Sequence, residues 1–365
     1  MRAPTSHRHF LIGFFLLTIY VVPLSQTAAE LLRGARPGFV EVFSEKPTAA
    51  NLRSFEREIE RSSVVAHAVR PWTQYFWFAA LGNGGDKTVM GLDGWLFYKP
   101  DLRYLLETGD ADGPVPVIVR FRDELASRGI HLLVAPVPGK PGVYPDRLTR
   151  RRLDTNLSPT RGLVASLREH GIETLDLFGQ FASCGEADPC YLERDTHWTG
   201  ATARRAAEAA AERIRALGWV SGGATPYTVR PVVVPRTGDL VRMMNSPALE
   251  RSAPPEQVRC EQVVRADTGE LDRDAPDSRV LVLGDSFLRI YQTDAPRAAG
   301  FVAHLARALG QPVASIINDG GASTLVRQQL ARAPKLLAGK NVVVWEFVER
   351  DVRFGTEGWQ DVPLP

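Results

Sequence analysis

The chain has 365 residues, enough for two or three domains or for one large α/β domain with extensions. Hydrophobic residues make up 44% of the sequence and charged residues 24%, which excludes disordered and fibrous classes. The 44 basic and 42 acidic residues leave a net charge of +2, so the charge balance gives no sign of a nucleic-acid partner.

The N-terminus predicts export. Basic residues, Arg2 and Arg8 among them, precede the almost wholly apolar residues 10–22. Positive charge followed by an apolar run is typical of a secretory signal or a short signal anchor. The run is shorter than the roughly 20 residues of a comfortable transmembrane helix, so cleavage and anchoring both stay open. We expect residues 1–29 to be a signal peptide or inner-membrane anchor and the rest to be periplasmic.

Three cysteines are too few for a disulfide framework. Cys184 and Cys190 are close enough in sequence to form a bridge in an oxidising compartment, and three unrelated thiols are the alternative. Because export is predicted, we favour the bridge, with Cys260 left over.

The segment after the leader predicts a helical extension over residues 30–80. A helical pattern opens at residues 46–48 and is expected to end before Pro71, and an aromatic run follows at residues 72–78. Further on, Asp93-Gly94 separates two short apolar runs. Both residues accept positive φ, so the pair predicts a β-hairpin.

From residue 115 the pattern alternates between helices and apolar strands, which predicts a three-layer α/β fold with a central parallel sheet. The Pro-rich segment 218–276 is expected to be irregular and to decorate the core. Helices are predicted at 115–128, 159–170, 200–217, 296–309 and 324–333, and strands at 130–137, 172–177, 279–283, 313–317 and 341–347.

A serine follows one of these strands. Sites of parallel sheets lie at the carboxyl ends of strands, and Gly284-Asp285-Ser286-Phe287 comes directly after the strand at 279–283. A serine on such a turn can be a nucleophile whose own N–H faces a developing oxyanion. Alone, the tripeptide is as compatible with a simple turn in which Ser286 caps a helix.

A candidate base lies in Asp195-Thr196-His197-Trp198, just before the helix that starts near Gly200. A nucleophilic serine needs a base, and the base needs an acceptor that fixes its tautomer. Asp195 and His197 can supply both from one loop, and the helix N-terminus, with Thr199 as N-cap, favours a neutral imidazole. The alternative is a surface histidine and a solvated carboxylate.

A zinc site built from Cys184, Cys190, Asp195 and His197 is another use of this loop. Structural zinc sites usually pair cysteines at closer spacing, as in C-x₂₋₄-C. We therefore predict neither a metal nor an organic cofactor.

The order of several motifs resembles the AlgJ/AlgX-type alginate O-acetyltransferases, periplasmic proteins with an SGNH-hydrolase-like domain. The likeness covers roughly residues 80–350. The blocks that carry it are Gly-Leu-Asp-Gly-Trp-Leu-Phe-Tyr at 91–98, Val137-Pro138-Gly139-Lys140, Tyr144-Pro145, Asp-Thr-His-Trp at 195–198, Gly-Asp-Ser-Phe at 284–287 and Val-Trp-Glu-Phe at 344–347.

The resemblance implies an SGNH-like acetyltransferase domain at residues 81–350 and a C-terminal tail at 351–365. The motif order is circularly permuted, because ordinary SGNH hydrolases carry the serine first and the histidine last. Carried over to this sequence, the family's triad is Ser286 as nucleophile, His197 as base and Asp195 as its partner.

The implied function is acetyl transfer, through an acyl-serine, to hydroxyls of an exported polysaccharide, with an MBOAT-type membrane acyltransferase as donor-side partner. A carbohydrate esterase with the same triad is one alternative, and a non-catalytic polysaccharide-binding assembly factor is another. The sequence leaves open the polymer, the donor and the oligomeric state. It also leaves open the second oxyanion donor, for which Asn83, Asn245 and Asn318 are candidates.

Overall fold

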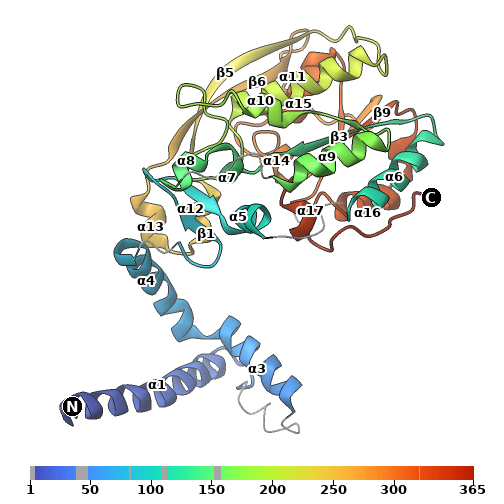
Figure 1. The fold of residues 1–365 in the computed structure, drawn as a ribbon. Helices are drawn as coiled ribbons and strands as arrows, with labels where there is room; N and C mark the ends of the chain where they lie inside the picture. The colour runs from blue at the N-terminus through green and yellow to red at the C-terminus, as the bar shows by residue number, and fades with distance from the viewer. Residues whose placement is uncertain (1–4, 38–47, 82–83, 108–112, 152–157, 320) are drawn as a thin grey trace. The chain divides into compact units, whose positions relative to one another are not determined.

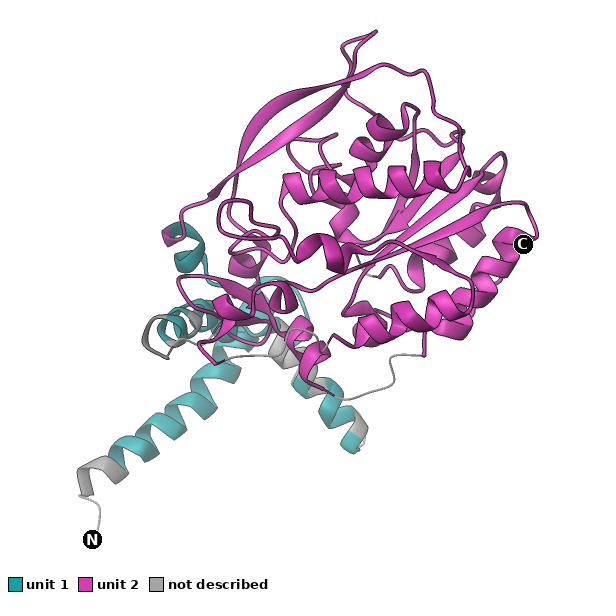
Figure 2. Ribbon diagram, turned by 45° about the horizontal axis from the view of Figure 1, so that its top comes forward, with its two compact units in different colours: residues 1–82, 245–251 teal, residues 83–244, 252–365 magenta. Residues whose placement is uncertain are grey.

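The computed structural model describes residues 5–37, 48–81, 84–107, 113–151, 158–319 and 321–365. The chain divides into two compact units (Figure 2). The first comprises residues 1–82 and 245–251, and the second comprises residues 83–244 and 252–365.

The first unit is helical, with α1 (Thr5–Leu32), α3 (Ala49–Ser62), α4 (Val64–Leu81) and most of α13 (Pro247–Ser252). Among the described residues, only the stretch His9–Leu32 of α1 is long and apolar enough to cross a membrane. The prediction that a helix ends before Pro71 is wrong. The break lies instead at Ser63, whose hydroxyl accepts the Ala66 N–H at 3.2 Å as an N-cap, and α4 then continues through the proline.

The second unit begins with the predicted hairpin. Strand β1 (Thr88–Met90) pairs antiparallel with β2 (Leu96–Tyr98). The turn residues Asp93 and Gly94 have φ values of 53° and 82°, so both adopt the positive φ that the sequence predicts.

A five-stranded sheet forms the centre of the second unit, and all its pairings are parallel (Figure 1). The strand order is β4-β3-β9-β7-β8, and β7 and β9 are buried along their whole length. The predicted parallel sheet is therefore confirmed. The strands are β3 (His131–Val137), β4 (Glu173–Thr174), β7 (Val280–Gly284), β8 (Ala314–Ile317) and β9 (Val342–Val348).

Helices cover both faces of the sheet, which makes the predicted three layers (Figure 1). Alternate strand residues point to opposite faces, and two apolar clusters result. One cluster joins the sheet to α10 (Leu177–Phe181), α11 (Gly200–Ala216) and α15 (Phe301–Leu309), and the other to α6 (Val115–Ala126), α9 (Pro159–Glu169) and α16 (Leu325–Arg332).

Short helices fill the connections around this core. They are α5 (Lys99–Leu106), α7 (Lys140–Val143), α8 (Pro145–Leu148), α12 (Asp239–Met243), α14 (Ser286–Arg289), the 3₁₀ helix η2 (Pro334–Leu337) and α17 (Asp351–Phe354). Helix α15 starts at Phe301 rather than at the predicted Pro296, because Arg297 and Ala298 take positive φ. The strand predicted at 172–177 shortens to β4, because Asp176 caps α10.

The prediction of an irregular segment at 218–276 is wrong. Strands β5 (Tyr227–Arg236) and β6 (Glu256–Arg265) pair antiparallel over ten residues and form a two-stranded ribbon. Pro231 and Pro235 lie within β5, where a ribbon tolerates them because each of its strands keeps one unpaired edge.

The cysteines pair as the export prediction favours. Cys184 is bonded to Cys190, and Cys260 is free and buried. The disulfide uses both thiols that the zinc alternative needs, so that alternative is wrong. The Cys190 carbonyl accepts the Thr199 N–H at 2.9 Å, which places the bridge at the base of the loop that carries Asp195 and His197.

Candidate active site

The turn after β7 presents Ser286 at the carboxyl edge of the sheet. Ser286 is the first residue of α14, and Asp285 caps this helix by accepting the Phe287 N–H at 2.8 Å. The other Asp285 oxygen accepts the Val348 N–H at 3.2 Å, which ties the turn to the end of β9. A Cβ on Gly284 would clash with the Glu346 carboxylate and the Leu288 side chain, so a larger residue here would force these side chains to move.

The loop that carries Asp195 and His197 is anchored to the same turn. Tyr191 and Trp198 form an isolated antiparallel bridge that closes the loop. Trp198 is fully buried, and its indole N–H donates to the Phe287 carbonyl at 3.1 Å. Thr199 caps α11 by accepting the Thr202 N–H, as predicted.

The three predicted site residues form one hydrogen-bonded chain. His197 Nε2 lies 2.8 Å from Ser286 Oγ, although the two residues are 89 positions apart in sequence. His197 Nδ1 lies 2.6 Å from Asp195 Oδ1 on the opposite side of the ring. Asp195 and His197 are buried, so the alternative of a surface histidine beside a solvated carboxylate is wrong. This geometry lets a base take the serine proton while a carboxylate orients the ring.

The charges around the ring keep Asp195 ionised and make His197 more basic. Burial opposes ionisation of Asp195, but the His197 ring and the Arg236 guanidinium outweigh it and hold the Asp195 pKa well below its usual range. Arg236 Nε donates to Asp195 Oδ2 at 2.7 Å. Burial alone would lower the pKa of His197, but the Asp195 carboxylate outweighs it and raises that pKa above 6.5.

Lys140 anchors the loop that carries Asp195 and His197. Its side chain is fully buried, and the ammonium donates to the carbonyls of Leu96 at 2.6 Å, Glu193 at 2.7 Å and Asp195 at 3.1 Å. An ammonium has three N–H donors, so each has a partner. Burial lowers the Lys140 pKa to about 8. The contacts join the β2 hairpin to the loop that carries the candidate base.

We expect Lys140→Met to unfold more easily and to lose activity. The change removes the donors of three inward-facing carbonyls, and each buried polar group left unpaired costs about 1–3 kcal/mol. The free energy of unfolding in urea should therefore fall by about 3 kcal/mol or more. Lys99→Met is the matched control, because the Lys99 ammonium donates to the single carbonyl of Gly85. An equal fall in the free energy of unfolding in the two variants would contradict the stabilising role of the three Lys140 contacts.

The candidate oxyanion donors fall in different places. Asn318 follows β8 at the same sheet edge as Ser286, and its backbone N–H donates to the Gly284 carbonyl at 3.0 Å. Asn245 belongs to the other unit, and Asn83 lies outside the described residues. Within the second unit, Asn318 therefore lies beside the turn that carries Ser286.

Two residues at the site escape the sequence analysis, Arg236 and Asp239. Both lie in the segment predicted to be irregular, at the end of β5 and the start of α12. The available signal was the alternation of apolar and polar residues at 227–230 and the β-branched run at 232–234, which Pro231 and Pro235 masked. Gly238 between them has a φ of 88°, and a Cβ there would clash with the Arg194 backbone.

Among the described residues, Asp195, His197 and Asp239 are close enough together to hold a metal ion. His197 Nδ1 and Asp195 Oδ1 are instead hydrogen-bonded to each other, and Arg236 donates a hydrogen bond to the second Asp195 oxygen. A cation would have to displace both partners, so we assign no metal to this group.

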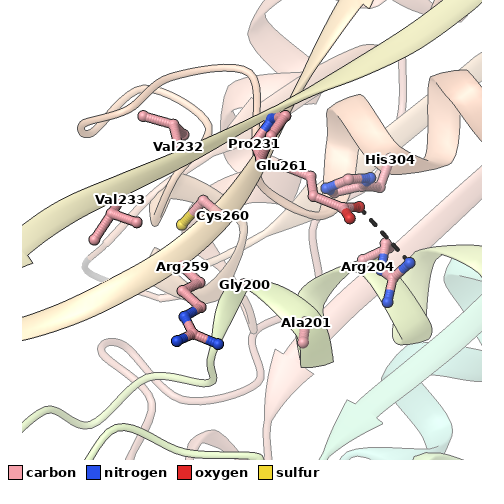
Figure 3. A pocket seen from close by; sticks show the side chains of 10 residues that line it. All are labelled: Gly200, Ala201, Arg204, Pro231, Val232, Val233, Arg259, Cys260, Glu261 and His304. Carbon is pink, nitrogen blue, oxygen red and sulfur yellow. Dashed lines mark ion pairs between the residues drawn. The ribbon is translucent and has the colours of Figure 1, made fainter.

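A separate pocket of about 390 Å³ lies between the β5–β6 ribbon and the start of α11 (Figure 3). Its lining includes Cys260, His304 and the Arg204–Glu261 ion pair, and none of Asp195, His197 and Ser286. Burial raises the Cys260 pKa to about 12, so the thiol is protonated and unreactive at neutral pH. Cys260 is therefore not a candidate nucleophile.

Comparison with known proteins decides the family. The family model described as "SGNH hydrolase-like domain, acetyltransferase AlgX" matches residues 88–349. The chain belongs to this family. The match confirms the predicted SGNH-like fold and the AlgJ/AlgX resemblance.

Individual relatives of the AlgX family agree with this assignment. The chain is 25% identical to the probable alginate O-acetylase AlgJ of Azotobacter vinelandii, over 75% of this chain and 71% of that one. It is 27% identical to the protein of the same name from Pseudomonas fluorescens, over 75% and 70% of the two chains.

Two solved structures share the fold. The O-acetyltransferase domain of Pseudomonas putida AlgJ superposes with a TM-score of 0.62 at 25% identity, covering 74% of this chain and 94% of that one. Pseudomonas aeruginosa AlgX gives a TM-score of 0.55 at 21% identity, covering 72% and 62%.

Proposed function

We propose that this protein is an O-acetyltransferase that moves an acetyl group, through an acyl-serine, onto hydroxyls of an exported, alginate-like polysaccharide. The observation that carries the proposal is the 2.8 Å contact between His197 Nε2 and Ser286 Oγ. Asp195 is hydrogen-bonded to Nδ1 on the opposite side of the same ring. Membership of an acetyltransferase family favours transfer over the esterase and assembly-factor alternatives.

The first half-reaction acetylates the enzyme. His197 Nε2 takes the Ser286 proton as Oγ attacks the carbonyl carbon of the donor, and a tetrahedral oxyanion forms. The Ser286 N–H faces that oxyanion, and we expect Asn318 to supply a second donor. Collapse breaks the bond to the donor, whose leaving group takes the proton from Nε2. Asp195 stabilises the imidazolium throughout.

The second half-reaction reverses these roles. A sugar hydroxyl gives its proton to Nε2 and attacks the acyl carbon. The ester bond to Ser286 breaks, Oγ regains the proton from Nε2, and the sugar leaves acetylated. Water following the same route gives ester hydrolysis, so the enzyme must hold the sugar hydroxyl in place of water.

The rate should depend on pH through His197. Only the neutral imidazole accepts the serine proton, and its pKa is raised above 6.5. The value of kcat/KM for an activated acetyl ester should therefore fall as pH drops through a pKa above 6.5. A kcat/KM that stays constant down to pH 6.5 would contradict the assignment of His197 as the base.

Transfer and hydrolysis are separated by one assay. The purified protein is incubated with an activated acetyl ester, with and without an oligosaccharide acceptor, and acetyl on the acceptor is measured. We expect acetylated acceptor and none with Ser286→Ala. Ester hydrolysis without any acceptor acetylation would instead support the esterase. Full polymer acetylation by Ser286→Ala in a deletion strain would support the assembly factor.

We further propose that α1 anchors the protein in the inner membrane, with the catalytic unit in the periplasm and an MBOAT-type acyltransferase delivering acetyl groups. The apolar stretch His9–Leu32 supports the anchor, and the basic residues before it favour a cytoplasmic N-terminus. The disulfide fits an oxidising compartment. Recovery of the protein in the soluble periplasmic fraction, with α1 cleaved off, would contradict the anchor.

A further inference from the structure

A second carboxylate lies behind His197. Asp239 Oδ2 is 3.5 Å from His197 Nδ1, the same ring nitrogen that Asp195 faces. The Thr196 hydroxyl lies between them, 3.2 Å from Nδ1, and donates to Asp239 Oδ2 at 2.5 Å. The other Asp239 oxygen accepts the Thr196 N–H at 2.8 Å. Asp239 is therefore fixed on two sides by the residue between Asp195 and His197.

The backbone of Asp239 is also hydrogen-bonded to the Asp195 carboxylate. The Asp239 N–H donates to Asp195 Oδ2 at 3.2 Å, and Arg236 donates to the same oxygen at 2.7 Å. Asp195 Oδ1 accepts hydrogen bonds from His197 Nδ1 at 2.6 Å and from the His197 backbone N–H at 3.1 Å. Asp195 thus has four donors, and two of them come from the short stretch between the end of β5 and the start of α12.

Arg236 also lies 3.7 Å from Asp294, whose own charge is paired with Arg289. The charges of Asp195, His197, Arg236 and Asp239 balance only when the imidazole is protonated. Asp195 and Asp239 bring two negative charges and Arg236 one positive charge, so the cluster carries one net negative charge when His197 is neutral. Proton transfer from Ser286 makes the ring cationic and the cluster neutral. Buried charge is costly unless compensated, so this arrangement favours the imidazolium that forms during the reaction.

We propose that Arg236 and Asp239 are positioning residues of the triad: Arg236 orients the Asp195 carboxylate, and Asp239, through Thr196, supplies a second negative charge behind the His197 ring. The inference rests on the proposed function, because it assigns His197 the role of base. It adds a role for the β5–β6 ribbon, whose last β5 residue reaches the site.

The two residues act on His197 with opposite signs. Burial lowers and Asp195 raises the His197 pKa most strongly; beyond these, Asp239 raises that pKa and Arg236 lowers it. Asp101 of α5, which is paired with Arg350 at 3.0 Å, also interacts electrostatically with His197. Removing the Asp239 charge should therefore lower the His197 pKa, and removing the Arg236 charge should raise it.

The test compares pH profiles of kcat/KM for an activated acetyl ester, using the full chain. We expect the acidic limb of Asp239→Asn to move to lower pH and that of Arg236→Met to higher pH. Each variant should lose about 10- to 100-fold in kcat, the usual effect of one charged hydrogen bond, with KM little changed. Arg236→Lys keeps the charge without the Nε geometry, so its limb should stay near the wild-type position while kcat falls.

Arg213→Met is the matched control, because it breaks an ion pair with Glu173 on α11 and β4. Its limb should not move. The inference is overturned if the acidic limbs of Asp239→Asn and Arg236→Met stay at the wild-type position or move in the same direction. If Arg236→Met does not fold, an unmoved limb in Asp239→Asn overturns it alone. Undiminished turnover by Ser286→Ala would instead overturn the proposed function.

Discussion

Ser286→Ala should lower kcat/KM for acetyl transfer by about 10⁴-fold or more, as expected when a triad nucleophile is removed. The single side-chain contact described for the Ser286 hydroxyl is the one to His197 Nε2. Removing the hydroxyl therefore abolishes acyl-serine formation while leaving no buried carbonyl or amide without a partner. The free energy of unfolding should change by less than about 1 kcal/mol.

The control for this variant is Ser127→Ala. The Ser127 hydroxyl is exposed and donates to the Glu124 carbonyl within the end of α6. Its loss should leave the rate unchanged. A Ser286→Ala protein that is folded and transfers acetyl at more than about a tenth of the wild-type rate would exclude Ser286 as nucleophile.

Asp195→Asn is expected to lower kcat by about 10⁴-fold, as an uncharged partner cannot hold the reactive tautomer or stabilise the imidazolium. The amide also removes the charge that Arg236 pairs with at 2.7 Å, and breaking a buried pair on one side is destabilising. We therefore expect the free energy of unfolding to fall by about 3 kcal/mol.

Steady-state kinetics and urea unfolding measure the two effects separately. Asp123→Asn is the control, since Asp123 pairs with Arg122 at an exposed position on α6. That variant should lose less than about 1 kcal/mol and keep its rate. A loss of stability without a loss of rate in Asp195→Asn would make Asp195 structural rather than catalytic.

The parts of the fold that the sequence predicts well are those with a strong local pattern. Strand β7 is a continuous apolar run, and β3 and β9 are apolar apart from His131 and Glu346. Asp93-Gly94 marks its turn by residue type. The placement of Ser286 follows from the rule that sites lie at the carboxyl ends of parallel strands. Its pairing with His197 is predicted from the resemblance to the AlgJ/AlgX-type family.

The missed parts depend on contacts between distant segments. Strand β5 finds its partner β6 about twenty residues later, and its prolines suggest a loop until that partner is known. Arg236 looks like an ordinary basic residue in the sequence, and Lys140 stands out there only as part of a block shared with the family. Their roles come from the Asp195 carboxylate and from three backbone carbonyls, which lie far from them along the chain.

The most direct test of the account is the mass of the protein quenched during turnover of an activated acetyl ester, followed by peptide mapping. We predict an added mass of one acetyl group on the peptide that contains Ser286. The adduct should accumulate in the absence of acceptor and disappear when an oligosaccharide is added. The claim that Ser286, activated by His197, is the nucleophile would be contradicted by an acetyl group on another residue. It would also be contradicted if Ser286→Ala turned over the ester with no adduct on any residue.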